Sequence, residues 1–221
     1  MNGWLAMVGG HEWTDGCRAI DELLLSETGA KEVLVVPTAA AYEQPQKVVA
    51  AASAYFADLG AKVKALDVLA RPAATDKANV KAIKAAKLVY FADGSSLHLR
   101  SVLKDTPVWD AVVAVWNDGT AIAGTGAGAM VLGDPMVDPR GGAFTLGLGL
   151  VPSMAAMTKT HDWHHETKRR TIQLATKGVP LVAVDDATAV MRSPDGKWSV
   201  VGVGAATVYF NGDQSELSRL P

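Results

Sequence analysis

The chain has only one cysteine, Cys17, among its 221 residues. A single thiol cannot form an intrachain disulfide, so the fold must be held by its hydrophobic core, and nothing requires an oxidising compartment. Cys17 falls in an amphipathic segment with no candidate base near it in the sequence. We therefore expect Cys17 to be a buried packing residue.

The chain also lacks an excess of charge of either sign and a long hydrophobic run. Its formal net charge is -2, and Lys and Arg are dispersed except at "KRR", Lys168 to Arg170. A nucleic-acid-binding protein would carry a basic patch or stripe. The first apolar stretch has no basic residues before it and ends at Gly9, which is too short for a signal peptide or a membrane span. We predict a cytoplasmic protein with no nucleic-acid or membrane partner.

What is present is a regular alternation of short apolar runs and helix-period segments. This pattern is typical of parallel strands joined by crossover helices. No linker divides the chain, so we predict a single α/β domain over residues 1–221, with a mainly parallel central sheet and helices on both faces. The predicted strands are 4–10, 32–38, 62–69, 87–93, 120–125, 154–159 and 180–186.

Caps and stop signals predict four helices between these strands, at 14–29, 44–60, 76–87 and 106–119. The last third differs, because "TAVMRSPDGKWSVVGVG" predicts an antiparallel hairpin with a turn at residues 194–196, and 206–212 predicts a further edge strand. The segment 134–152 is rich in glycine and fits neither helix nor strand. A loop of that length is more often functional than idle.

The segment "GTGAGAMVLGD", residues 124–134, predicts a tight turn between a buried strand and a helix. Its first five residues match G-x-S-x-G, the nucleophile elbow of α/β hydrolases, except that Gly126 stands in the place of the serine. Glycine tolerates the strained backbone of an elbow but has no hydroxyl to attack a carbonyl. The Ala127 N–H would be half of an oxyanion hole. The motif predicts a hydrolase-like site without its nucleophile.

Two other interpretations of this region stay open. Residues 124–129 also match G-x-G-x-x-A of a dinucleotide site, but they follow the fifth predicted strand, whereas such sites follow the first. Ser95, Ser96 and Thr125 carry hydroxyls near the same sheet edge and are candidate replacement nucleophiles. None of the three lies in an elbow, so neither alternative has the support of a complete motif.

Several segments, in order along the chain, resemble the serine peptidases related to dipeptidase E and cyanophycinase. They are "GGHEWTDGC", "VLVVPTAAAYEQP", "VYFADGSSLHLRSVLKDTPVWDAV", "IAGTGAGAMVLGDPMVDPRGGAFTLGLGLVP" and "PLVAVDDATAV". The resemblance implies a class I glutamine-amidotransferase-like α/β fold. It also implies a Ser-His-acid machinery that cleaves bonds beside aspartyl residues.

Carried over residue by residue, the resemblance places Gly126 on the nucleophilic serine and His161 near the catalytic histidine, with His164 and His165 as alternatives. Asp186 falls where a cyanophycinase-like enzyme has its acid, and Asp138 lies in the loop that supplies the acid in dipeptidase E. Either acid is a candidate.

The resemblance implies that the oxyanion donors are the N–H groups of Ala127 and Gly94. The family's glycine pair reads Asp93-Gly94 here, and an inward-pointing Asp93 would repel a developing oxyanion. The alternative for Asp93 is an N-cap for the following helix.

A metal site is the alternative interpretation of "HDWHHE", because His161 and His165 have the i, i+4 spacing of one helix face. We expect no metal and no cofactor, since no remote ligand is identifiable and exposed histidines at a helix N-terminus explain the pattern. Asp185 and Asp186 have a similar alternative, as caps of the turn that follows their strand.

Together these features predict a dipeptidase E/cyanophycinase-like homologue that acts on or binds aspartyl or β-aspartyl peptides and is inactive or impaired because of Gly126. Three alternatives remain: a non-catalytic binding or regulatory pseudoenzyme, a hydrolase that uses water activated by His161, and an engineered nucleophile knockout. The expected partner is a small peptide or amino-acid-derived ligand, and a homodimer is left open.

Overall fold

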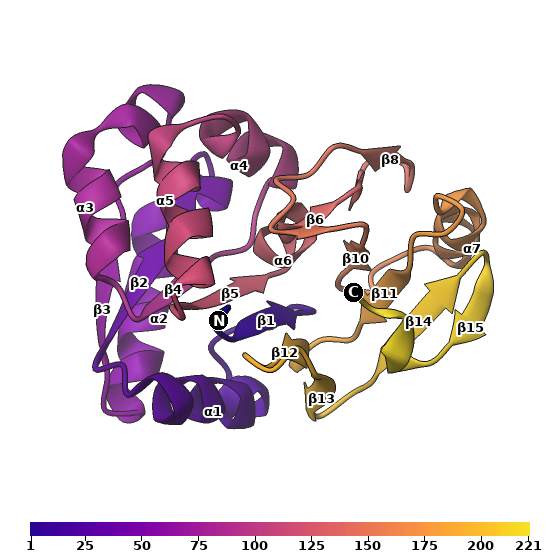
Figure 1. Cartoon of the computed structure of the whole chain (residues 1–221), viewed down its shortest axis with the longest axis horizontal. Helices are drawn as coiled ribbons and strands as arrows, with labels where there is room; N and C mark the ends of the chain where they lie inside the picture. The colour runs from indigo at the N-terminus through magenta and orange to yellow at the C-terminus, as the bar shows by residue number, and fades with distance from the viewer.

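A seven-stranded sheet runs through the centre of the computed structural model, which describes residues 1–221 (Figure 1). The strand order is β13-β12-β1-β5-β4-β2-β3. Neighbours from β1 to β3 are all parallel, whereas β12 is antiparallel to both β1 and β13. The strands are β1 (Leu5–Val8), β2 (Glu32–Val36), β3 (Lys62–Ala65), β4 (Leu88–Phe91), β5 (Ala121–Thr125), β12 (Thr188–Arg192) and β13 (Trp198–Gly202).

Helices cover both faces of this sheet, as the apolar strands predict. Alternate residues of β1 face opposite sides: Leu5 and Met7 belong to one core cluster, Ala6 and Val8 to the other. The helices α1 (Arg18–Thr28) and α2 (Pro45–Asp58) pack on the Ala6 side. The helices α3 (Lys77–Ala85), α4 (Ser96–Leu103) and α5 (Pro107–Asn117) pack on the Leu5 side.

Several signals that predicted helix boundaries act as expected, but Thr14 makes no cap bond, and α1 begins at Arg18 after a 3₁₀ turn. Helix α1 ends at Gly29, whose φ of 59° is the left-handed conformation that glycine adopts without cost. Asp76 accepts a hydrogen bond from Ala78 N at 2.7 Å at the start of α3, and the Thr106 hydroxyl accepts one from Trp109 N at the start of α5. Cys17 is buried beside α1, as predicted.

Three predicted strands exist but do not belong to the central sheet. A second, four-stranded sheet has the order β10-β11-β14-β15 and lies with α7 at the right of Figure 1. Its strands are β10 (Ala155–Met157), β11 (Leu181–Val184), β14 (Ala206–Phe210) and β15 (Asp213–Ser215). Placing 154–159, 180–186 and 206–212 in the central sheet was therefore wrong. The predicted hairpin β12–β13 occupies the free edge of β1, so none of the three pairs there.

Short elements fill the remaining connections. The glycine-rich segment 134–152 forms two-residue strand pairings that the sequence did not predict. Among the helices, none has the length and apolar character needed to span a bilayer. These elements are α6 (Ala127–Leu132), α7 (His165–Leu174), β6 (Gly133–Asp134), β7 (Met136–Val137), β8 (Phe144–Thr145), β9 (Val151–Pro152) and the 3₁₀ turns η1 (Asp15–Cys17), η2 (Pro37–Ala40), η3 (Arg71–Thr75) and η4 (Leu217–Arg219).

The carboxyl group of Asp21, a residue of α1, is fully buried. Asp21 accepts a hydrogen bond from the Tyr55 hydroxyl at 2.9 Å through Oδ2, while its Oδ1 has no partner. Burial raises the pKa of Asp21 from 3.8 to about 7, because water no longer stabilises the charged form. The folded protein thus holds this proton over a pH range in which the unfolded chain has released it.

We expect Asp21 to make the protein less stable as the pH rises from about 4 to about 7. The folded pKa is the higher one, so its contribution is complete below the unfolded pKa and is lost as the pH approaches 7. An Asp21→Asn variant should lose this dependence and exceed the parent near neutral pH by up to roughly 4 kcal/mol. Urea unfolding across this pH range measures the free energy of unfolding, with the exposed Asp58→Asn substitution as the control. An equal dependence of that free energy on pH in the parent and in Asp21→Asn would contradict the prediction.

Candidate functional site

The predicted strand–turn–helix connection around Gly126 is present between β5 and α6. Gly126 has φ 51° and ψ −115°, a strained conformation that a side chain tolerates poorly. Its N–H donates to the Val8 carbonyl at 3.0 Å, which ties the turn to the carboxyl end of β1. A Cβ on Gly128 would lie 2.8 Å from the Phe91 carbonyl carbon, so only glycine lets α6 approach β4 this closely.

The Asp93 carboxylate covers the turn. Asp93 follows β4, and its Oδ1 accepts a hydrogen bond from Ala127 N at 2.8 Å, at the head of α6. A Cβ on Gly126 would overlap this carboxylate, lying 2.8 Å from Oδ2 and closer still to Oδ1. The N–H expected to bind an oxyanion is thus already bound to an internal anion. The alternative interpretation, in which Asp93 is the N-cap of α4, is wrong. The cap is Ser95, whose hydroxyl accepts a hydrogen bond from His98 N.

Two residues that the sequence analysis did not select complete the surroundings of Asp93. Lys159, two residues beyond β10, forms an ion pair with Asp93 Oδ2. Burial alone would lower the pKa of Lys159, but the hydrogen bond and charge of Asp93 raise it. Glu12 accepts a hydrogen bond from Thr125 at 3.2 Å, and burial together with the charge of Asp93 raises its pKa. Neither residue belongs to a recognisable motif.

His161 and Asp186 lie in contact, although they come from different loops. His161 Nδ1 is 2.9 Å from Asp186 Oδ2, and Nε2 of the same ring is 2.9 Å from Asp162 Oδ1. A general base that serves an elbow must keep one ring nitrogen free for the nucleophile's proton. In His161 both ring nitrogens face carboxylates.

The alternative candidates take other places. Asp138 pairs with Arg140, whose Nη2 lies 2.6 Å from Oδ2, and not with a histidine. His164 is the residue before α7, and His165 is the first residue of that helix. The idea that His161 and His165 share a helix face is therefore wrong, because α7 begins after His161.

Asp185 has a structural role, but its side chain bonds to other segments and not to the turn that follows its strand. Its Oδ1 accepts from the Thr160 hydroxyl at 2.6 Å, and its Oδ2 accepts from Ala205 N at 3.1 Å. These bonds tie the segment that follows β10 to the connection before β14. Asp186 is left to face His161.

A pocket of about 350 Å³ opens beside the turn. Asp93, Gly94 and Ala127 line it together with the cationic side chains of Lys159 and Arg140. Gly94 has φ 139°, and a Cβ there would lie 2.9 Å from Ala40 N. The pocket therefore contains both predicted oxyanion donors, but it also contains the carboxylate that occupies one of them.

The hydroxyl groups proposed as replacements are engaged or buried. Ser95 caps α4, and the Thr125 hydroxyl donates to Glu12. Ser96 is buried and lines the pocket, with no hydrogen-bond partner for its hydroxyl. The dinucleotide interpretation requires a phosphate at the head of α6, where the Asp93 carboxylate would repel it.

Comparison with family models gives a match to peptidase family S51 over residues 5–197. This chain belongs to peptidase family S51. The match includes the β5–α6 turn, Asp93, Lys159, His161 and Asp186. The expectation drawn from the resemblance, a dipeptidase E- and cyanophycinase-related protein with this α/β fold, is confirmed at the level of the family.

Individual relatives agree with the family. A cyanophycinase from Nostoc sp. is 26% identical over 96% of this chain and 74% of its own length, and one from Geminocystis herdmanii is 27% identical over 69% and 60%. A solved peptidase from an acI-B1 Actinobacterium superposes with a TM-score of 0.86 at 27% identity, covering 98% of this chain and 94% of that one. A putative peptidase E from Listeria monocytogenes, with a TM-score of 0.67, 16% identity and coverage of 92% and 100%, shares the fold.

We expect Gly126 and Asp93 to be energetically coupled. Gly126→Ala places a Cβ against the Asp93 carboxylate and imposes φ 51° on alanine, so the single variant should lose on the order of 2–4 kcal/mol of unfolding free energy. Combined with Asp93→Gly, the same substitution should cost about 1–2 kcal/mol less, because only the backbone strain remains. A double-mutant cycle by urea unfolding measures the coupling, and strictly additive effects would contradict the overlap.

Proposed function

We propose that this S51 homologue does not hydrolyse peptides through an acyl-enzyme and instead binds an aspartyl or β-aspartyl peptide, or a related amino-acid-derived ligand, in the pocket beside Gly126. The observation that carries the proposal is the Asp93 carboxylate on the Ala127 N–H. It occupies the space above a turn that has no hydroxyl.

The position of Asp93 opposes acyl-transfer chemistry in two ways. The Ala127 N–H already donates to Oδ1, so it is not free to stabilise the oxyanion of a tetrahedral intermediate. The negative charge of the carboxylate would also raise the energy of that oxyanion in a partly buried site. The ion pair with Lys159 holds the Asp93 carboxylate in place.

The contacts of His161 argue against the alternative of a hydrolase that uses activated water. A base that activates water needs an accepting nitrogen turned toward the substrate. His161 directs one nitrogen to Asp186 and the other to Asp162. The pairing of Gly126 with Asp93 likewise disfavours an engineered knockout, since restoring a serine would make its side chain overlap the carboxylate.

The pocket favours a small polar ligand over a hydrophobic one. Lys159 and Arg140 line it together with Asp93 and Asp162, so a ligand there meets charges of both signs. The relatives' names support a peptide-derived ligand: cyanophycinases and a putative peptidase E share this family or fold. An aspartyl carboxylate on the Lys159 side of the pocket fits this charge distribution.

The first test is hydrolysis of Asp-X and β-aspartyl dipeptides by four proteins side by side: the parent, Gly126→Ser, Asp93→Gly and the double variant. We expect no turnover by the parent or by either single variant. We expect measurable turnover by the double variant, which restores both a serine and a glycine pair and offers His161 Nε2 a serine partner in place of the exposed Asp162. Turnover by the unmodified protein would overturn the proposal that it does not hydrolyse peptides.

Ligand binding is tested separately by thermal unfolding with the same dipeptides. A ligand that binds only the folded state raises the midpoint in proportion to ln(1 + [L]/Kd). We expect a rise for the parent and a smaller one for Lys159→Met, while Lys81→Met, on α3 and outside the pocket, should behave as the parent. The absence of any rise across the dipeptide panel would rule out this ligand class.

A further inference from the structure

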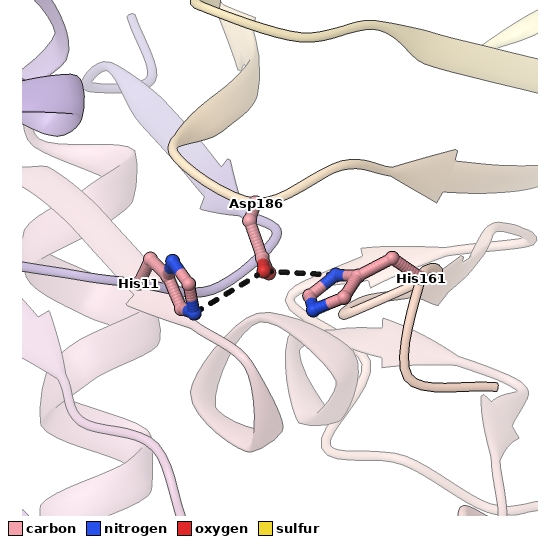
Figure 2. Close-up of side chains that lie close together, drawn as sticks. All are labelled: His11, His161 and Asp186. Atoms are coloured by element: carbon pink, nitrogen blue, oxygen red, sulfur yellow. Dashed lines mark ion pairs between the residues drawn. The ribbon is translucent and has the colours of Figure 1, made fainter.

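Figure 2 shows three side chains that converge from separate loops: His11, His161 and Asp186. His161 Nδ1 lies 2.9 Å and His11 Nε2 3.5 Å from Asp186 Oδ2, and one potential ligand atom from each residue lies within 4.8 Å of the others. His11 has no role in the proposed ligand pocket, and it is not one of the pocket's lining residues. The convergence therefore calls for an explanation of its own.

The backbone is built to bring the three residues together. His11 follows β1, Asp186 lies between β11 and β12, and His161 lies between β10 and α7. A non-glycine residue in the left-handed region occurs in each loop: His11 itself at φ 53°, Lys159 at 52° and Ala187 at 48°. Cross-loop hydrogen bonds hold this conformation, from Ala187 N to the Gly10 carbonyl and from Lys159 N to the Gly9 carbonyl. Such strain persists where the surrounding structure enforces it, often at functional sites.

The hydrogen bonding of His161 leaves room for a cation. A neutral imidazole carries one N–H, so it can donate to Asp162 or to Asp186 but not to both. With Nε2–H on Asp162, the Nδ1 lone pair faces Asp186 Oδ2 at 2.9 Å, and two acceptors oppose each other unless a positive charge lies between or beside them. A second proton on the ring, or a metal ion bound to both atoms, satisfies this arrangement.

The remaining contacts favour the metal ion. A metal-ligating histidine usually donates its other ring N–H to a carboxylate, which is the position of Asp162 here. Asp186 Oδ1 is buried without a hydrogen-bond partner, and the contacts of this carboxylate with the two histidines are made through Oδ2. His11 and His161 are 68% and 56% exposed, which gives a hydrated ion access to the group.

The donor set also fits a specific class of ion. Two imidazoles and one carboxylate suit first-row divalent transition metals, and Zn²⁺ in particular is bound by three such ligands with water in a fourth position. Ligand bonds of about 2.0–2.1 Å place tetrahedral donors roughly 3.3 Å apart. The two contacts to Asp186 Oδ2, 2.9 and 3.5 Å, bracket that spacing.

We propose that His11, His161 and Asp186 form a binding site for one divalent transition metal ion, with Zn²⁺ as the best-fitting member. Asp162 is a positioning residue that holds the His161 ring through Nε2. The site lies next to the Asp93–Lys159 pair, since Lys159 precedes His161 by two residues, but it shares no ligand with the proposed peptide pocket. It does not rest on the proposed function, because the ion binds whether or not the protein binds peptides.

The test is calorimetric titration of the chelator-treated, dialysed protein with ZnCl₂ near neutral pH. We expect one Zn²⁺ per chain, an increase in the unfolding midpoint on binding, and a loss of affinity at about pH 5.5, where histidine protonates. MgCl₂ should not bind at the same concentrations, because Mg²⁺ prefers oxygen ligands.

Variants separate this site from other histidines of the chain. His11→Asn keeps a residue that tolerates positive φ. We expect His11→Asn and Asp186→Asn, each made alone, to weaken Zn²⁺ binding by at least about tenfold. Asp162→Asn should weaken it by about 10–100-fold, as loss of a ring-orienting carboxylate does elsewhere. The double variant His164→Asn/His165→Asn is the control: these exposed neighbours do not belong to the group, so its affinity should equal that of the parent.

Two results would overturn the site. One is the absence of Zn²⁺ binding to the parent protein in the micromolar range, which would leave a proton as the bridging charge. The other is binding that survives His11→Asn and disappears in His164→Asn/His165→Asn, which would place the ion on the exposed segment before α7. Far-ultraviolet circular dichroism of each variant ensures that a lost site is not a lost fold.

Discussion

The site is organised by one hydrogen bond, from Ala127 N at the head of α6 to the Asp93 carboxylate. It requires the short strand–turn–helix connection between β5 and α6, which places the Ala127 amide beside the residue that follows β4 by two positions. It also requires Gly126, since any side chain at that residue would overlap the carboxylate. Lys159 neutralises Asp93 from the second sheet, so two sheets and a turn meet at a single anion.

This arrangement changes what the S51 fold can do here. The sheet still presents the carboxyl ends of β1, β4 and β5 at one edge, where ligands of parallel α/β proteins bind. The N–H at the head of α6, an expected oxyanion donor, binds the Asp93 carboxylate. His161, the expected base, lies between the carboxylates of Asp162 and Asp186. These contacts are the basis of the proposal that the site binds a ligand without acyl transfer.

Much of the fold was predictable because its signals are local. Apolar runs, caps and glycine stops fix the strands and helices from β1 to β5, and the hairpin turn at 194–196 fixes β12 and β13. Strand partners were less predictable, since β10, β11 and β14 are short apolar runs whose sequences do not specify a partner strand. β12 takes the edge of β1 instead, a contact between residues more than 180 positions apart.

The sequence by itself determined the turn around Gly126, the lack of a hydroxyl there and the candidate pair of His161 with Asp186. Only the tertiary structure decided that Asp93 points at Ala127, and that Asp185 ties two loops while Asp186 faces His161. It also decided that Lys159 pairs with Asp93, that Glu12 bonds to Thr125 and that His11 faces Asp186. The reason is physical. A turn motif is encoded by neighbours along the chain, whereas an ion pair or a group of ligands depends on where unrelated loops converge after the sheets have formed.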